Sequence, residues 1–491
     1  MKKGRKSTFE RLAGKSLNRK QRRQLQQRFD SPEPGLELIH RNAAGIDVGN
    51  TSHFVAVPEG RDPEPVQEFG CWTADLVRMC QWLQACGIET VVMQATGVYW
   101  IPLYDQLQQH GFAVVVANAQ HTKNVPGRKS DVREARWLRQ LHSYGLLANG
   151  FQLEGEMEKV RTVWRLRDRH VKEAGRAVQH MQKALTKMNV QLANVISDLS
   201  GVSGQAILGA ILEGERDPYR LADLRHERVR ASREEVARSL EGNWREDVVF
   251  ELRQAVEQYQ FAQRQMQGCD EQLKQYLSAL PSALPRPRRK EEGGSGSDSE
   301  TARPAKKATR GNAPSFDVRG ELQRIAGVDL TSIEGINVMT AQTILSEVGV
   351  DLSRFASENH FVSWLGLTPS HDISGGKVIG RGRRKVQNRV AMSLRMAAST
   401  LRNSPSYLGA RYRYLCRKLP SKASAVKAMA RYLGILVYRM LTKGPEWVDR
   451  GAAAYEQKRG DAELASLSKR AAAKGYGLVP KAGFQPSAIQ V

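Results

Sequence analysis

The sequence contains little cysteine and lacks any long hydrophobic run. Its cysteines are odd in number and form no CxxC pair, which argues against a disulfide framework or a zinc site and fits a reducing compartment. No apolar run reaches the length of a membrane span, and the basic N-terminus lacks the apolar core of a signal peptide. These features predict a cytoplasmic protein with no membrane partner. The five cysteines are Cys71, Cys80, Cys86, Cys269 and Cys416.

Acidic residues are scarce relative to basic ones, and the basic residues are clustered. The chain has 75 Lys and Arg against 51 Asp and Glu, a formal net charge of +24. Residues 1–30 hold eleven Lys or Arg and two acids, and residues 377–440 hold sixteen Lys or Arg and no acid. A surface that only keeps a protein in solution mixes both signs, so stretches of one sign indicate contact with a polyanion. The charge pattern therefore predicts a nucleic-acid partner.

The first part of the chain predicts an α/β domain. Residues 43–60 predict two strands joined by a polar turn, and the runs "ETVVMQA" and "FAVVVANA" predict buried strands. Residues 73–87, 100–111 and 131–145 have helical spacing, and Ser130 or Asp131 could cap the third helix. The order β-β-α-β-α-β-α implies a central sheet over residues 39–150, after a basic arm at 1–38.

The middle of the chain, residues 151–284, carries a seven-residue repeat. From Val171 to Leu199 apolar residues alternate at spacings of three and four, as in four unbroken heptads. A second run from Val249 to Leu280 keeps the register, with Gln263 and Asp270 at seam positions. Two long helices are predicted, which could pair with each other or with another chain. The narrow seam favours a coiled coil that joins chains into a dimer or tetramer.

The last part of the chain predicts a linker, a helical domain and a tail. Residues 285–315 are rich in Pro, Gly, Ser and charge, which is typical of a disordered linker. Residues 316–450 predict a helical domain, and 451–491 predict a tail that is helical in part. The segment 330–349 is similar to a helix-hairpin-helix, whose second helix offers N–H groups to a phosphate. A plain helical hairpin in the core is the alternative. Tyr407, Tyr412 and Tyr414 are expected mainly in the core, with base contact as the alternative.

Four side chains with oxygen donors are candidates for a cation site. Asp47 interrupts an apolar strand, where an unpaired charge is costly, and Gln94 ends another strand. Asp131 and Glu134 share one helix face, which the β-α order lets approach the first strand. Hard oxygen ligands of this kind suit Mg²⁺, which supports phosphodiester chemistry. The alternatives are an Asp47 bonded to the adjacent turn and acids that are favoured in any first helical turn.

A second candidate centre lies at "SGGK", where Ser374 precedes two glycines and Lys377. Glycines let the backbone approach another group closely, but a serine hydroxyl is a poor nucleophile without an activating group. Composition alone therefore favours a flexible turn before an arm that contacts phosphates. Candidates for nucleic-acid contact are the basic residues near both centres: Lys123, Arg128, Lys129, Lys377, Arg381, Arg383, Arg384 and Lys385.

Several long motifs carry a resemblance to a known family. "GIDVGN", "MQATGVYWIPLY" and "NAQHTKNVPGRKSDVREARWL", followed by "GINVMTAQTILSEVG" and "FVSWLGLTPSHDISGGKVIGRGRRKVQNR", occur in the order found in the DEDD-type insertion-sequence transposases of the IS110 family. The chain resembles that family over most of residues 40–445.

The resemblance implies a RuvC-like, RNase H-related N-terminal domain whose four acids bind Mg²⁺. The first acid matches Asp47 and the third Asp131; the fourth falls on Glu134, where Asp is usual, and the second on Gln94, where the family has Glu. It also implies that Ser374 is the nucleophile that joins covalently to DNA. An element-encoded guide RNA is implied as a further partner.

The sequence thus predicts an RNA-guided DNA transposase or recombinase, with two alternatives. Gln94 keeps one oxygen donor but removes a negative charge, so the chain could be a catalytically impaired protein that only binds nucleic acid. It could also be a RuvC-like nuclease that cuts branched DNA without using Ser374.

Overall fold

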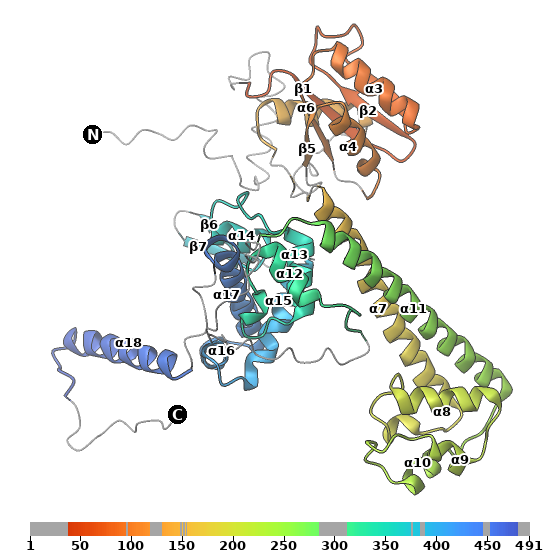
Figure 1. The fold of residues 1–491 in the computed structure, drawn as a ribbon. Coiled ribbons are helices and arrows are strands. Elements are labelled where there is room, and N and C mark those ends of the chain that lie inside the picture. Colours follow the sequence, from red (N-terminus) through yellow and green to blue (C-terminus); the bar gives the residue numbers. More distant parts are fainter. Residues whose placement is uncertain are drawn as a thin grey trace, which may run out of the picture. The chain divides into compact units, whose positions relative to one another are not determined.

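The computed structural model describes residues 38–94, 97–117, 130–147, 150, 153, 155–283, 312–374, 377–382, 388–444 and 452–479, with the backbone alone at 370–374 and 377–382 and at parts of the last helix. The predicted arm at 1–38 and linker at 285–315 lie almost entirely outside the described residues. The chain divides into two compact units, Met1–Gln152 and Leu153–Val491 (Figure 1).

Five strands form one sheet in the first unit, in the order β3-β2-β1-β4-β5. β1 (Ala43–Val48), β2 (Ser52–Ala56) and β3 (Val66–Gly70) form an antiparallel meander. β4 (Thr90–Gln94) and β5 (Ala113–Ala117) run parallel to β1. The predicted hairpin and both buried strands are confirmed. The sequence pattern misses β3, because this edge strand buries only Phe69 among polar neighbours.

Helices cover both faces of this sheet. α3 (Thr73–Ala85) and α4 (Trp100–Gln109) pack on one face, where Leu83 and Leu107 share a core with Ile46 and Met93. α6 (Asp131–Ser143) packs on the other face, where Leu138 contacts Val92 and Ala117. As predicted, glycines follow the first two helices; Gly87 has a φ of 67° and Gly111 one of 85°, a conformation that favours glycine. The α/β architecture predicted for this part of the chain is confirmed.

Two long helices open the second unit. α7 (Glu156–Lys187) and α11 (Glu246–Ala279) lie side by side along their length (Figure 1). Apolar residues of both helices meet in the seam, among them Ala174, Ala262 and Met266. The two helices of one chain therefore pair with each other, and association between chains stays a prediction.

The first heptad run is shorter than predicted. α7 ends at Lys187, and Asn189 adopts a positive φ of 57°. Leu192 and Leu199 lie beyond this end and join a core with three short helices, α8 (Val202–Glu213), α9 (Pro218–Asp223) and α10 (Arg233–Ser239). Apolar spacing continues past the end of the helix because these residues serve this other core. The prediction of four unbroken heptads is therefore wrong beyond Lys187.

The remainder of the second unit is mostly helical, as predicted. It also contains a two-stranded antiparallel sheet that the sequence analysis did not predict, β6 (Ser370–Ser374) with β7 (Lys377–Gly382). Glycine and polar residues dominate these short strands, which leaves little apolar alternation to detect. The helices are α12 (Val318–Ala326), α13 (Val338–Val348), α14 (Glu358–Trp364), α15 (Arg389–Thr400), α16 (Tyr407–Lys418), α17 (Lys422–Lys443) and α18 (Ala452–Ala472).

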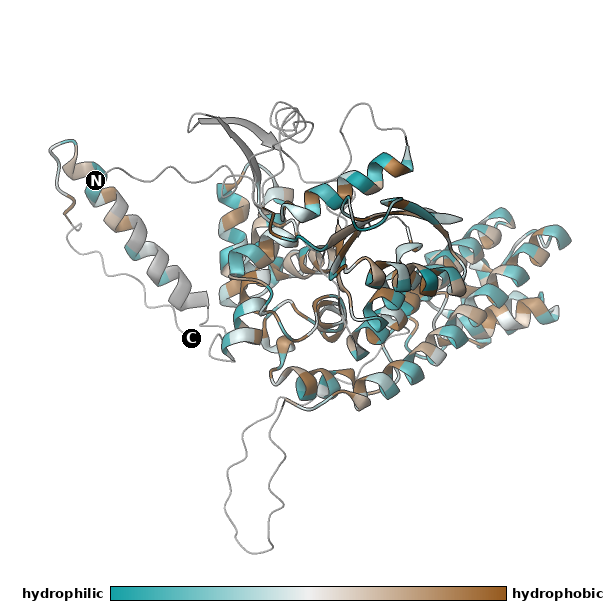
Figure 2. Ribbon diagram, turned by 90° about the horizontal axis from the view of Figure 1, so that it is seen from above, coloured by the Kyte–Doolittle hydropathy of each residue, from teal (hydrophilic) through white to brown (hydrophobic). Residues whose placement is uncertain are grey.

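The structure bears on two of the expectations drawn from composition. All five cysteines are free thiols. Within the part of the chain that the structure describes, no helix is long and apolar enough to cross a bilayer. Hydrophilic and hydrophobic residues alternate along the helices instead (Figure 2).

Candidate metal and nucleophile sites

A close backbone contact places α6 against β1. A Cβ atom built at Gly45 would lie 2.3 Å from the backbone N of Arg139 and 2.5 Å from the carbonyl O of Ala135. Both neighbours are backbone atoms, so a side chain at this position would have to push α6 away. Sequence reasoning missed Gly45, although a glycine inside an apolar strand signals such a close approach. The contact brings the first turn of α6 toward Asp47, two residues further along β1.

The opposite end of α6 is held against the sheet by a polar contact. Oγ1 of Thr90, the first residue of β4, lies 2.9 Å from Nε2 of the buried His142. Burial, with a smaller contribution from His40, lowers the pKa of His142 to about 4. The imidazole is therefore neutral near pH 7, and α6 is held against the sheet at its middle and near its C-terminal end.

Asp47 and Gln94 lie on the face of the sheet that α6 covers. Ile46 and Met93 form the last parallel pair between β1 and β4, so Asp47 and Gln94 follow at the same level of the sheet. Because successive side chains point to opposite faces, Asp47 and Gln94 point away from the core that holds Ile46 and Met93. Gln94 is buried. Parallel strands end at a common edge, where α/β proteins commonly bind ligands.

Electrostatics link Asp47 to the two acids of α6. Burial raises the pKa of Asp47 from 3.8 to about 6, with further increases from the charges of Glu134 and Asp131. The backbone N–H of Val48 opposes the shift. The two acids that were predicted to approach the first strand are thus near enough to repel its carboxylate.

The first turn of α6 carries both acids. Asp131 is exposed and Glu134 is half-buried. Ser130 is the N-cap residue, but its side chain accepts no capping hydrogen bond. Among the described residues, no three Asp, Glu, His or Cys side chains are arranged to hold a metal ion together. The structure therefore gathers the predicted oxygen donors in one region without forming a coordination shell.

Exposed apolar residues follow Gln94 at the same edge of the sheet. Val98 is 67% exposed and Tyr99 is 49% exposed, directly before α4. About half of the Tyr99 side chain is therefore covered by its neighbours. Trp100 does pack, edge-on against Tyr104 with ring centroids 5.7 Å apart.

Ser374 lies at the end of β6, next to the turn of the hairpin. Its register partner across the ladder is Lys377, and an irregularity between Asp372 and Ile373 precedes it. Paired strands thus flank the segment that was predicted to be a flexible turn, and the backbone of Ser374 belongs to the first of these strands. Arg381 belongs to β7. Six candidate contact residues lie outside the described residues: Lys123, Arg128, Lys129, Arg383, Arg384 and Lys385.

The segment compared with a helix-hairpin-helix contains the expected turn. Gly335 has a φ of 89°, and its Cβ position lies 3.0 Å from the carbonyl O of Ala397, so glycine is required there. Asn337 caps α13 by accepting a 2.8 Å hydrogen bond from the backbone N of Thr340. The capping side chain already uses one of the N–H groups at this helix end.

Residues 388–444 present basic side chains with few acidic partners. They contain twelve Lys or Arg and no Asp or Glu. The ion pairs found there use acids from elsewhere: Arg389 contacts Asp168, and Arg439 contacts Glu358. Lys422 and Lys427 are exposed. This part of the surface suits a polyanion.

The three tyrosines near these basic residues have mainly structural surroundings. Tyr412 is buried. The hydroxyl groups of Tyr407 and Tyr432 lie 3.2 Å apart, and the Arg411 guanidinium stacks 3.9 Å from the Tyr432 ring centroid. The Lys418 ammonium lies 5.7 Å from the ring centroid of Tyr414.

Comparison with known proteins assigns the chain to a family. Residues 44–190 match a family model for the DEDD-type IS110 group described as "Transposase", and residues 329–413 match one described as "Transposase IS116/IS110/IS902 family". No curated protein matches the chain. The first matched segment contains Asp47, Gln94, Asp131 and Glu134, and the second contains Ser374. With both segments present in this order, the chain belongs to the IS110 family of DNA transposases.

Proposed function

We propose that this transposase cuts and rejoins DNA with Mg²⁺ and a serine nucleophile. The observation that carries the proposal is the electrostatic coupling of Asp47 to Glu134 and Asp131 at the edge of the sheet. A partly buried carboxylate that two neighbouring carboxylates repel is costly unless a cation balances its charge. The RuvC-like relationship of the first unit and the helix-hairpin-helix role of residues 330–349 belong to the same proposal.

The donor set fits Mg²⁺ by its chemistry. Asp47, Asp131, Glu134 and the amide oxygen of Gln94 are hard oxygen ligands, and Mg²⁺ typically takes a few carboxylates together with water and phosphate. Bound there, the cation would neutralise charge that develops on the phosphate during displacement.

Ser374 would supply the nucleophile. Its Oγ forms a bond to phosphorus, the bond from phosphorus to one deoxyribose oxygen breaks, and the hydroxyl proton is transferred to that leaving oxygen. The product is a phosphoserine ester and a free sugar hydroxyl. A second sugar hydroxyl then attacks the phosphorus of this ester. The bond from phosphorus to the Ser374 Oγ breaks, the hydroxyl proton returns to Oγ, and the strand is rejoined. Lys377 and the basic residues that follow would stabilise the added negative charge.

An element-encoded RNA would guide the reaction, and several chains would act together. The basic surface of residues 388–444 supports an RNA partner, because A-form RNA is bound largely through its backbone and shape. Assembly into a dimer or tetramer through the α7–α11 region would bring two DNA ends to several active sites.

Gln94 favours one second candidate, a family member that binds nucleic acid but no longer cuts it. The buried amide stands where the family has an acid, so metal affinity should be lower than in a four-acid site. This candidate predicts binding without Mg²⁺ and without strand transfer.

A covalent-adduct assay tests the proposal. The protein is incubated with DNA of the element's ends, candidate guide RNA and Mg²⁺, and protease-sensitive protein–DNA species are sought on a denaturing gel. Ser374→Ala and Asp131→Ala should abolish the adduct. Ser399→Ala and Asp105→Ala, at exposed positions of α15 and α4, are matched controls that should retain it.

The other outcomes separate the alternatives. Nicked DNA without an adduct, unaffected by Ser374→Ala, would establish a nuclease. Tight binding with neither product would establish the impaired binder, and the variant Gln94→Glu would then be expected to restore cutting.

A further inference from the structure

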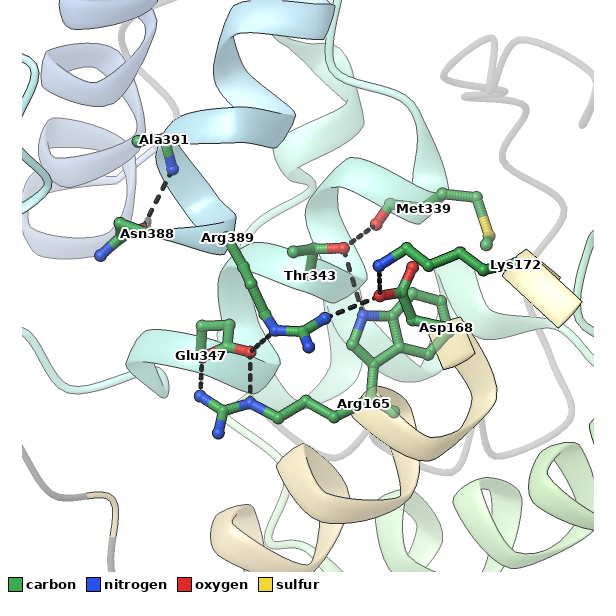
Figure 3. Close-up of polar contacts among 10 residues, drawn as sticks. Arg165, Asp168, Lys172, Met339, Thr343, Glu347, Asn388, Arg389 and Ala391 are labelled. Carbon is green, nitrogen blue, oxygen red and sulfur yellow. Dashed lines mark hydrogen bonds and ion pairs between the residues drawn. The ribbon is translucent and has the colours of Figure 1, made fainter. Parts of the chain in front are cut away.

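A polar junction joins α7 to α13 and α15 within the second unit (Figure 3). Arg165 of α7 donates two hydrogen bonds to the carboxylate of Glu347 on α13, at 2.8 and 2.6 Å. The indole N–H of the buried Trp164 donates to Oγ1 of Thr343 at 3.1 Å. These contacts fix α7 against α13.

Arg389 extends the junction to α15. Its Nη1 donates to Oδ2 of Asp168 on α7 at 2.7 Å, and its Nε lies 3.8 Å from Oε1 of Glu347. Arg389 therefore lies between two carboxylates from two different helices, as the close-up shows (Figure 3). Oδ2 of Asp168 also accepts a 2.7 Å hydrogen bond from Lys172 of the same helix.

The position of Arg389 in the chain gives this contact its significance. It is the first residue of α15, directly after the N-cap Asn388, whose side chain accepts a hydrogen bond from Ala391 N. In the other direction the chain leads through residues 383–387 to β7 and Ser374. The contact thus lies where the segment that carries Ser374 returns to the helical body.

The contact is not needed to hold α15 itself. Val390, Leu394 and Ala398 bury the inner face of the helix. The Arg389 and Asp168 side chains are 40% and 35% exposed, and ion pairs this exposed contribute little to folding stability. Its influence should therefore fall on the first turn of α15 and on the hairpin that precedes it.

We infer that Arg389, held by Asp168 and Glu347, is a positioning residue for the β6–β7 hairpin and hence for Ser374. The role of Ser374 rests on the proposed function, whereas the anchoring of the hairpin does not. The guanidinium connects α7 and α13 to the first residue of α15, and the chain before this residue leads to the hairpin, so the orientation of α7 would reach the serine along the chain.

Hydrogen exchange of the full-length protein, without nucleic acid, tests the anchor. Arg389→Gln and Asp168→Asn should each raise amide exchange in residues 370–382 by roughly three- to tenfold, and the double variant should add little. Arg389→Lys, which keeps the charge, should rescue part of the effect. Lys172→Met is the matched control, because it removes an equally short bond to Asp168 that connects no second helix.

The adduct assay supplies the second readout. The variants that loosen the hairpin should form adduct roughly tenfold more slowly at unchanged DNA affinity, since misplacement of a reacting group lowers its rate. Unchanged exchange in both variants, or a loss of DNA affinity in Arg389→Gln alone, would overturn the inference and make Arg389 a phosphate contact. Faster exchange with no adduct from the unmodified protein would contradict the proposed function and leave the anchor standing.

Discussion

At the residue scale, the candidate metal site contains one carboxylate, Asp47, whose charged form is disfavoured by burial and by two neighbouring acids. The pKa of Asp47 lies near 6 chiefly because of burial and then because of Glu134 and Asp131. A carboxyl whose pKa is raised in the folded state stabilises the fold only while it stays protonated. That contribution is complete below about pH 4 and is lost as the pH rises through 6.

Asp47→Asn should therefore stabilise the metal-free protein above pH 6, because the amide stays neutral. A shift from 3.8 to about 6 sets an upper bound of about 3 kcal/mol. The difference in unfolding free energy between Asp47→Asn and the unmodified protein should grow from pH 4 to pH 6 and stay constant at higher pH. The pKa of His142 is lowered, so its contribution to stability has the opposite pH dependence. His142 is present in both proteins, and its contribution cancels in the difference. A constant difference at every pH would contradict the explanation.

Gln94→Glu should raise Mg²⁺ affinity by on the order of tenfold, because it adds a fourth charge to the donor set. Isothermal titration, and the increase in Tm with Mg²⁺, would measure it. Gln109→Glu, at an exposed position of α4, is the control for added charge alone. Equal affinities in all three proteins would mean that residue 94 does not contact the cation.

At the element scale, close packing and one buried ion pair fix the arrangement of the helices. Gly45 sets the approach of α6 to the sheet, and a pair between Arg167 and Asp270 links α7 to α11. The guanidinium Nε and Nη2 lie 2.5 and 3.2 Å from the carboxylate oxygens, and both residues are almost fully buried. The backbone N of Ser315 donates to the same carboxylate at 3.1 Å.

Gly45→Val should displace α6 and destabilise the first unit by more than about 3 kcal/mol, as overpacking against rigid backbone does at its upper range. Limited proteolysis and far-UV circular dichroism would show the loss. Gly175→Ala in α7, whose Cβ would meet open space, is the control and should be neutral or slightly stabilising. A stable Gly45→Val protein with intact Mg²⁺ binding would refute the role of this contact.

Asp270→Asn should lower the stability of the α7–α11 pair by about 3–5 kcal/mol, since it leaves the Arg167 charge buried without a counter-charge. The double variant Arg167→Met with Asp270→Leu should recover most of the loss, because it removes both charges. Denaturant unfolding measures the loss, and in a protein whose other tryptophans are replaced by phenylalanine the fluorescence of Trp164, which lies 5.6 Å from the Arg167 guanidinium, reports on this region. Similar losses in the single and double variants would mean that packing rather than charge dominates.

At the scale of the whole molecule, the net charge of +24 should determine the affinity for nucleic acid, and this affinity should not depend on the Mg²⁺ that strand cutting requires. Removal of Mg²⁺ with a chelator should stop strand cutting while DNA binding persists and weakens steeply with salt. Lys422→Gln together with Lys427→Gln should reduce the slope of log K against log salt by about two. Lys187→Gln, at a residue paired with Glu251, is the control and should leave the slope unchanged. Binding that is lost with Mg²⁺ would contradict this separation.

The sequence by itself determined the α/β unit, the mostly helical second part and the family. These depend on local apolar runs, glycine stops and motif order, which are properties of neighbouring residues. The order of the strands' hydrophobic runs was enough to predict a sheet with Asp47 within its first strand and Gln94 at the end of another.

Only the tertiary structure decided how far the heptads extend, what Asp270 pairs with and where Gly45 is needed. In each case the decisive partner is distant in sequence: the core of α8–α10 for Leu192 and Leu199, Arg167 for Asp270, and the backbone of α6 for Gly45. The sequence likewise did not predict the hairpin at Ser374 or the contacts of Arg389 with Asp168 and Glu347. A one-dimensional pattern reports periodicity, whereas pairing between distant segments depends on which surfaces the folded chain brings together.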